Sequence, residues 1–177
     1  MKKILYTFVC AGVLLSCGGC TGESRPDYAE LSRRLSEYNE NYAFEYFDMF
    51  LYEGAYQVYF SLCSRDDVLL SMNFGEDGSI DDITVTACSD SMKTTGERAA
   101  YCSFALSAVS AFTMLSTEDI TKIQRNLSFD DTNIYFSDLY ETYTLSRYNF
   151  IFSSNSEYIC LYAEYFEEME LSGSIEN

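Results

Sequence analysis

The first long pattern of apolar positions along the chain has the spacing of an amphipathic helix. Ser24 and Pro26 are typical of the start of a helix, with Ser24 as the N-cap and Pro26 in the first turn. The apolar residues behind them recur at steps of three or four: Tyr28, Leu31, Leu35, Tyr38, Tyr42, Tyr46 and Met49. We therefore predict one long N-terminal helix that ends near Gly54, and the Asn39-Glu40-Asn41 stretch is the place where it could bend or break.

Three later runs have the composition of β-strands: residues 56–63, 68–74 and 83–88. Turn-forming residues at positions 64–67 and 75–79 separate these runs. Asp77-Gly78, which lies between two of them, is a strong hairpin signal. Short turns between successive strands predict an antiparallel meander.

The second half of the chain predicts two helices and a hairpin. Residues 97–115 carry apolar side chains over a broad face, which is typical of a buried helix. Ser116 has the chemistry of a new N-cap, with an acidic residue at the third helical position, and this second helix extends through Leu127. Residues 140–152 and 157–165 have strand composition and flank a polar turn, so they predict a hairpin.

This order of elements predicts an α+β fold in which the helices pack on one face of an antiparallel sheet. We expect a single α+β domain over residues 26–166, followed by an acidic tail at 167–177. A domain of this size buries about two thirds of the surface that its unfolded chain exposes, so its fold does not depend on disulfides.

The first 20 residues have the organisation of a secretory signal peptide. Lys2 and Lys3 precede an apolar run over residues 4–15, and small residues follow it. The run is too short to span a membrane, which takes about 20 apolar residues. We expect residues 1–16 to be the signal peptide.

The sequence Leu14-Leu15-Ser16-Cys17 resembles the lipobox of bacterial lipoproteins, which places a leucine three positions before the modified cysteine. The resemblance implies cleavage before Cys17 and a diacylglyceryl thioether on its sulfur, with acyl chains of the palmitate type. It also implies an extracytoplasmic protein anchored to the cell membrane or envelope, with residues 17–25 as a tether. Cys20 is the alternative attachment site, and an ordinary secretory signal is the alternative to a lipobox.

The charge of the chain excludes several classes of function. It contains 28 acidic and 11 basic side chains and no histidine, for a formal net charge of −17. Nucleic acid is not an expected partner, because binding phosphates requires clustered cations. Without histidine there is no Ser-His-Asp or Cys-His catalytic machinery and no imidazole ligand for a metal. Because an acidic domain is repelled by anionic headgroups, we expect the lipid alone to hold the protein at the membrane.

Four cysteines remain beyond the signal peptide and the lipobox: Cys63, Cys88, Cys102 and Cys160. An extracytoplasmic location permits disulfides. Cys63 and Cys88 end two strands that flank a third, which is too far for one bond. Cys102, early in the next helix, is therefore the expected partner of Cys88. Four buried free thiols are the alternative.

No metal, cofactor or catalytic site is predicted. The segment from Asn73 to Asp81 echoes a calcium loop, but Gly75 and Thr84 stand where the EF-hand pattern needs ligands. A carboxylate pair can hydrolyse glycans without histidine, but the sequence does not single out two carboxylates. A His-independent envelope hydrolase is therefore the alternative function.

Aromatic residues are the most unusual feature of the composition. The chain has 16 Tyr and 13 Phe but no Trp, and ten of these side chains lie between Tyr38 and Phe60. Exposed tyrosine is typical of recognition surfaces. The alternative is an aromatic core whose hydroxyls reach water. We predict a binding surface that includes Tyr38, Tyr42, Tyr46, Tyr52 and Tyr56.

These observations predict a non-catalytic binding or accessory domain with an acidic, tyrosine-rich surface. The expected partner is a basic protein segment or an envelope component. A structural accessory lipoprotein without a ligand is a further alternative.

Overall fold

The structure is a computed structural model of the 177-residue chain. It describes residues 25–40, 42, 44–52, 55–62, 65–135 and 138–167, and side chains at 25–40, 42, 67–134 and 138–167. The predicted signal peptide, Cys17, Cys20 and Cys63 lie outside the described residues. Of the predicted acidic tail, only its first residue lies within them.

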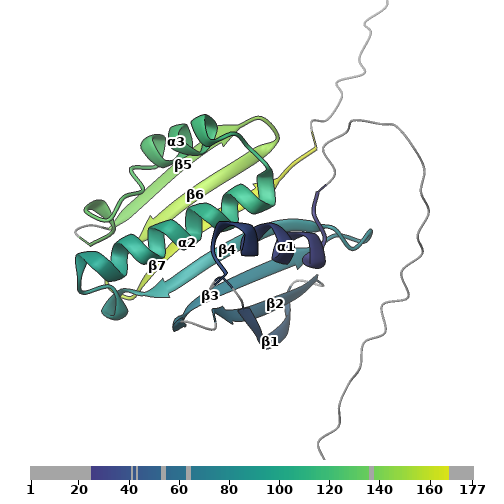
Figure 1. Ribbon diagram of the computed structural model, residues 1–177, viewed down its shortest axis with the longest axis horizontal. Helices are drawn as coiled ribbons and strands as arrows, with labels where there is room; N and C mark the ends of the chain where they lie inside the picture. Colours follow the sequence, from purple (N-terminus) through teal and green to yellow (C-terminus); the bar gives the residue numbers. More distant parts are fainter. Residues whose placement is uncertain are drawn as a thin grey trace, which may run out of the picture.

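The described part of the chain forms one seven-stranded antiparallel sheet in the order β1-β2-β3-β4-β7-β6-β5 (Figure 1). The last strand in sequence, β7, pairs with β4, so the N-terminal and C-terminal halves of the chain share one sheet. The strand bounds are β1 Phe44–Tyr52, β2 Ala55–Leu62, β3 Arg65–Phe74, β4 Ile80–Cys88, β5 Leu139–Leu145, β6 Tyr148–Ser154 and β7 Tyr158–Tyr165.

Three helices, α1 (Tyr28–Tyr38), α2 (Thr95–Thr113) and α3 (Thr117–Asn126), lie on the same face of this sheet (Figure 1). The helix α2 runs across the middle of the sheet and contacts both α1 and α3. Short 3-10 turns occur at Ser89–Ser91 and Asn133–Tyr135. The predicted α+β class, with helices on one face of an antiparallel sheet, is therefore confirmed.

Each helix begins with a side chain that accepts a hydrogen bond from its first turn. Asp27 caps α1 by accepting from the backbone N–H of Glu30, so the N-cap is not Ser24 as the sequence predicted. Thr94 and Glu97 form a reciprocal capping box at α2. Ser116 caps α3, as predicted.

The prediction of one long N-terminal helix is wrong. The helix α1 ends at Tyr38, and Asn39 has an extended backbone with φ −163° and ψ 127°. The following residues, Phe44–Tyr52, form the edge strand β1, which pairs with β2. Aromatic residues favour strands as well as buried helix faces, so pairing with β2 overrides the helical spacing of this segment. The predicted three-strand meander is correspondingly a four-strand one.

The prediction of a single C-terminal hairpin is also incomplete. The run at 140–152 contains a two-residue turn at Ser146-Arg147, and Ser146 has a left-handed φ of 57°. The run therefore forms two strands, β5 and β6, before β7. Sequence signals for two-residue turns depend on Gly, Asn or Asp, and serine at this position gives little warning.

The hydrophobic core lies between the helices and one face of the sheet. Side chains of β6 and β7 alternate between buried and partly exposed, as expected for a sheet covered on one face. The helix α2 contributes large buried side chains that include Tyr101, Phe104 and Phe112. The hydroxyl of Tyr101 donates to the backbone oxygen of Val85 in β4 at 2.8 Å, which attaches α2 to the centre of the sheet.

Candidate binding groove along α2

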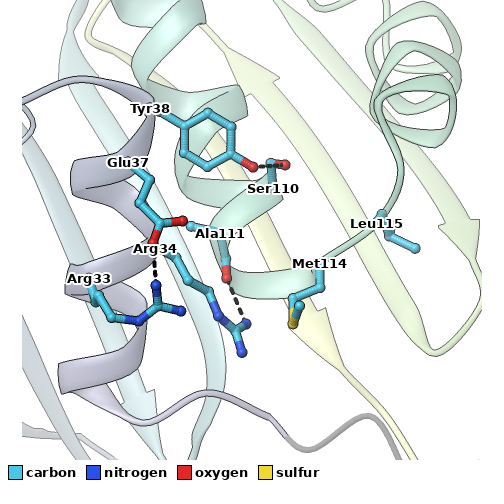
Figure 2. Close-up of a pocket in the computed structure, with 8 residues that line it drawn as sticks. All are labelled: Arg33, Arg34, Glu37, Tyr38, Ser110, Ala111, Met114 and Leu115. Atoms are coloured by element: carbon cyan, nitrogen blue, oxygen red, sulfur yellow. Dashed lines mark hydrogen bonds and ion pairs between the residues drawn. The ribbon is translucent and has the colours of Figure 1, made fainter.

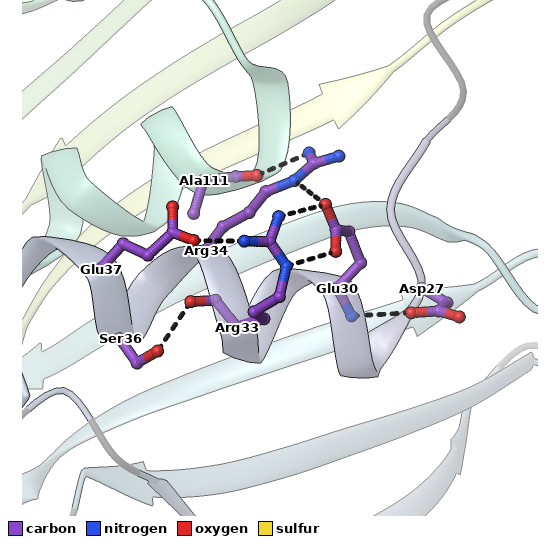
Figure 3. Close-up of polar contacts among 7 residues, drawn as sticks. All are labelled: Asp27, Glu30, Arg33, Arg34, Ser36, Glu37 and Ala111. Atoms are coloured by element: carbon purple, nitrogen blue, oxygen red, sulfur yellow. Dashed lines mark hydrogen bonds and ion pairs between the residues drawn. The ribbon is translucent and has the colours of Figure 1, made fainter.

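A network of charged side chains attaches α1 to the C-terminal end of α2 (Figure 3). Arg34 donates from Nε to Glu30 Oε1 at 2.7 Å and from Nη1 to the backbone oxygen of Ala111 at 3.1 Å. Arg33 donates to both carboxylate oxygens of Glu30 at 2.8 Å and also pairs with Glu37. A cation at the last carbonyls of a helix satisfies acceptors that the helix leaves free.

This network also sets the ionisation of Glu30. Hydrogen bonds from Arg33 and then Arg34 lower the pKa of Glu30 to about 2. Glu30 stays ionised throughout the physiological range and holds the two arginines in place. Arg33 and Glu37 are exposed and their ion pair adds little stability, whereas the Arg34 side chain is only 13% exposed and attaches α1 to α2.

Two tyrosines extend from the end of α1 along the outward face of α2. The hydroxyl of Tyr38 lies 2.6 Å from Ser110 Oγ (Figure 2), and the hydroxyl of Tyr42 lies 3.0 Å from Ser103 Oγ. Ser103 and Ser110 are seven residues apart, which is about two helical turns, so they share one face of α2. The Tyr42 ring also packs edge-on against Phe104, with ring centroids 5.2 Å apart. These contacts fix both rings beside α2.

Two adjoining hollows follow this face of α2. The first has a volume of about 370 Å³ and lies between α1 and the end of α2 (Figure 2). The second, of about 430 Å³, lies between α2 and α3. They share Tyr38, Ser110 and Leu115, and we call them together the α2 groove. It is lined by Arg33, Arg34, Glu37, Tyr38, Ser103, Leu106, Ser107, Ser110, Ala111, Met114, Leu115, Ser116, Thr117 and Ile120.

The α2 groove combines small hydroxyl side chains with apolar ones. The small side chains of α2 leave room for the hollow: Ser103, Ser107 and Ser110. The partly buried apolar surface comes from Leu106, Leu115 and Ile120. At the rim, Tyr38 is 53% exposed and Met114 is 65% exposed. Exposed tyrosine and methionine are typical of surfaces that bind proteins, because methionine adapts to an apolar partner and tyrosine combines a large apolar ring with a polar hydroxyl.

The predicted tyrosine surface is brought together only in part. Tyr38 and Tyr42 lie beside the α2 groove, whereas Tyr46 and Tyr52 are in β1 and Tyr56 is in β2. The side chains of the last three lie outside the described residues. The serines of α2 were not predicted as part of the site, although their spacing of three and four within an otherwise apolar helix is a usable signal.

The structure does not contain the predicted Cys88–Cys102 disulfide. Cys88, Cys102 and Cys160 are free thiols. Cys88 is exposed at the end of β4, whereas Cys102 is buried in α2 on the helix-covered side of the sheet. Burial raises the pKa of the Cys102 thiol to about 12, so this thiol is protonated and unreactive at neutral pH.

A second polar cluster crosses the sheet on the face away from the helices. Asn73, Asp82, Glu164 and Asn149 are successive cross-strand neighbours in β3, β4, β7 and β6. The amide nitrogen of Asn73 donates to both oxygens of Asp82, at 3.0 and 2.9 Å. Within the described residues, the buried Oδ1 of Asn73 has no hydrogen-bond partner.

Asp82 is an unusual member of this row because only 9% of it is exposed. Burial raises its pKa, the Asn73 hydrogen bond opposes that rise, and the neighbouring Glu164 adds to it. Burial, Asp82 and Glu164 also raise the pKa of Tyr162 in β7. Two carboxylates side by side on adjacent strands therefore disfavour ionisation of the whole cluster.

Replacing Asp82 with asparagine is expected to stabilise the protein at neutral pH by up to about 1 kcal/mol, because it removes a like-charge cross-strand pair. The unfolded wild type ionises Asp82 near pH 3.8, and the folded form only at higher pH. The contribution of Asp82 to stability should therefore fall as the pH rises above 3.8, and the advantage of the variant over the wild type should disappear below that pH. Thermal unfolding of both proteins over a pH series from about 3 to about 8 measures both effects.

Asp90→Asn is the matched control, because this carboxylate is 89% exposed and the change in net charge is the same. Equal stabilisation by both substitutions would show that the gain comes from lower net charge and not from the buried pair.

The calcium-like segment forms a tight turn between β3 and β4. Gly78 has a left-handed φ of 80°, which confirms the predicted hairpin. Asp77 accepts from the backbone N–H of Ser79 at 3.0 Å, and Arg25 pairs with Asp77 and Asp81. The negative charges of Asp77 and Asp81 are therefore already balanced by Arg25.

The described residues contain no group of three His, Cys, Asp or Glu side chains that could hold a metal ion. No helix among them is both long and apolar enough to cross a membrane. Two further hollows, beside Arg125 and Asp130 and beside Asp90 and Asn155, each contain one carboxylate, as does the α2 groove. None of these hollows brings two carboxylates together for glycoside hydrolysis.

No protein-family model, curated protein or solved structure matches this chain.

Proposed function

We propose that this protein is a lipid-anchored lipoprotein of the bacterial cell envelope whose folded domain binds a partner without catalysing a reaction. The lipobox-like sequence Leu14-Leu15-Ser16-Cys17 supports the anchor, with Cys17 as the lipidated residue and Cys20 as the alternative. The single observation that supports binding is the α2 groove, along which Tyr38 and Tyr42 are held by hydrogen bonds to serines of α2.

The partner that fits best is a protein segment with both basic and apolar side chains. A formal net charge of −17 attracts a cationic partner and increases its rate of encounter. Inside the groove, Arg33 and Arg34 are already paired with Glu30 and Glu37, so little net charge remains there. Leu106, Leu115 and Ile120 can then bury apolar side chains of the partner, while charges elsewhere steer it.

A bulky residue in the middle of the α2 groove is expected to prevent this binding. Ser107→Trp fills the hollow between α2 and α3 and leaves the tyrosine hydrogen bonds in place. Loss of a central contact surface commonly costs about 2 kcal/mol or more, so the affinity for the partner should fall at least about thirtyfold. The measurement is capture from envelope extracts by the immobilised protein, at low and high salt.

Ser156→Trp, on the exposed turn between β6 and β7, is the control and should capture the same protein as the wild type. Equal capture by Ser107→Trp, or capture that does not weaken with salt, would contradict the proposal. The second result would specifically remove the role of the acidic charge.

A further inference from the structure

Among the residues that the structure describes, β5 is an edge strand of the sheet and has few of the features that usually protect an edge. Its pairing with β6 continues without a shift from Leu139 to Leu145. It contains one charged residue, Glu141, and no proline or lysine. The opposite edge strand, β1, is interrupted by a shift between Tyr46 and Asp48 and carries two acidic residues. Bulges and charges of this kind normally prevent edge strands from pairing with other chains.

The backbone of β5 is oriented to accept another strand. The two-residue turn at Ser146-Arg147 makes Leu145 and Tyr148 the hydrogen-bonded closing pair of the β5–β6 hairpin. Since hydrogen-bonded and non-hydrogen-bonded pairs alternate, Tyr140, Thr142 and Thr144 direct their N–H and C=O groups toward the open edge. Their side chains are exposed, and that of Tyr140 is 69% exposed.

The sequence of β5, Leu-Tyr-Glu-Thr-Tyr-Thr-Leu, is complementary to itself when two copies run antiparallel. We propose that β5 pairs with β5 of a second copy of this chain about a two-fold axis at Thr142. Each strand would then place Thr142 opposite Thr142, Tyr140 opposite Thr144, Glu141 opposite Tyr143 and Leu139 opposite Leu145 of the other copy.

Every pair in this register is chemically compatible. Leucine opposite leucine and tyrosine or threonine opposite threonine are favourable cross-strand neighbours. Glu141 lies directly opposite Tyr143, whose hydroxyl can donate to its carboxylate, and only diagonally across from Glu141 of the second copy. The pairs centred on residues 140, 142 and 144 each exchange two backbone hydrogen bonds. Glu141 is the one charged residue of β5, and it does not lie directly opposite Glu141 of the second copy. A second copy of β5 therefore fits this edge better than a strand with many charged residues.

The two-fold axis has a consequence for the α2 groove. A continuous antiparallel sheet requires the axis to be perpendicular to the sheet, so both helix layers lie on the same face. The two α2 grooves would then lie on the same face of the dimer and be open to a partner with two binding segments. The dimer itself does not depend on the proposed binding function.

Sedimentation of the full-length protein in detergent tests the dimer. The wild type should sediment as a dimer, and the dimer fraction should rise with salt because screening reduces repulsion between two strongly acidic copies. Thr142→Lys and Thr142→Glu should each be monomeric, since identical charges would face each other across the axis. An equimolar mixture of the two variants should recover the dimer through a Lys–Glu pair.

Thr132→Lys and Thr132→Glu are the controls, because Thr132 is an exposed turn residue that is not part of β5. Circular dichroism checks that all variants fold. The proposal is overturned by a wild type that stays monomeric at every concentration and salt, or by a dimer that both Thr142 variants retain. A mixture of the variants that remains monomeric would also overturn it. Salt should strengthen the dimer and weaken partner capture, so failure of one proposal can be told from failure of the other.

Discussion

Replacing Arg98 with methionine is expected to lower the free energy of unfolding by about 3 kcal/mol or more. The guanidinium lies in α2 with only 8% of the residue exposed. It donates to the backbone oxygens of Asp131 at 2.6 Å, Met92 at 3.2 Å and Lys93 at 3.1 Å. These carbonyls belong to the segments before α2 and after α3, so one side chain attaches two loops to the central helix. Methionine fills similar volume but leaves the carbonyls without their donor.

Denaturant unfolding measures this loss, and two further variants test its cause. Arg98→Lys should restore little stability, because a compact ammonium cannot reach all three carbonyls as the planar guanidinium does. Arg33→Met removes an arginine that is 57% exposed and should have a much smaller effect. Similar losses for Arg98→Met and Arg33→Met would contradict the role given to the buried hydrogen bonds.

Replacing Cys17 with alanine is expected to abolish lipid attachment completely. The proposed thioether needs the sulfur of this residue, and no other side chain of the lipobox-like sequence can replace it. Each buried CH₂ of an acyl chain contributes about 0.8 kcal/mol to membrane affinity, so the lipid accounts for essentially all of the anchoring. Metabolic labelling with a palmitate analogue in a bacterial host measures the attachment directly.

Cys20→Ala is the matched control and should keep the label. Loss of the label in Cys20→Ala and not in Cys17→Ala would move the attachment site to Cys20. A wild type without label would contradict the proposed lipoprotein, while leaving the α2 groove and its binding test unaffected.

Much of the fold follows from local signals that the sequence contains. Ser116 caps α3, Gly78 lies in the turn between β3 and β4, and the apolar run at 97–115 forms most of the buried helix α2. These predictions succeed because capping, turn conformation and a broad apolar face depend on residues close together in the chain. The predictions that fail concern the segments 44–52 and 140–152. Each is rich in aromatic residues, and its local pattern is compatible with more than one structure.

In the candidate site, too, the sequence predicted local features but not the contacts between distant segments. The sequence singled out Tyr38 and Tyr42, because their density exceeds what one helix face can bury. It did not indicate that Ser103 and Ser110, more than 60 residues away, hold these rings in place. The row from Asn73 to Asn149 likewise exists only through the pairing of β3, β4, β7 and β6.

The sequence by itself determined the acidic charge, the absence of histidine, the predicted lipidation site, the α+β class and most helix and turn positions. Those properties depend on composition or on neighbours within a few residues. Only the tertiary structure decided that Phe44–Tyr52 is a strand, that β4 pairs with β7 and that α1 lies against α2 to form a groove. The physical reason is that these features depend on contacts between distant segments, whose hydrogen bonds and buried surface outweigh local preference.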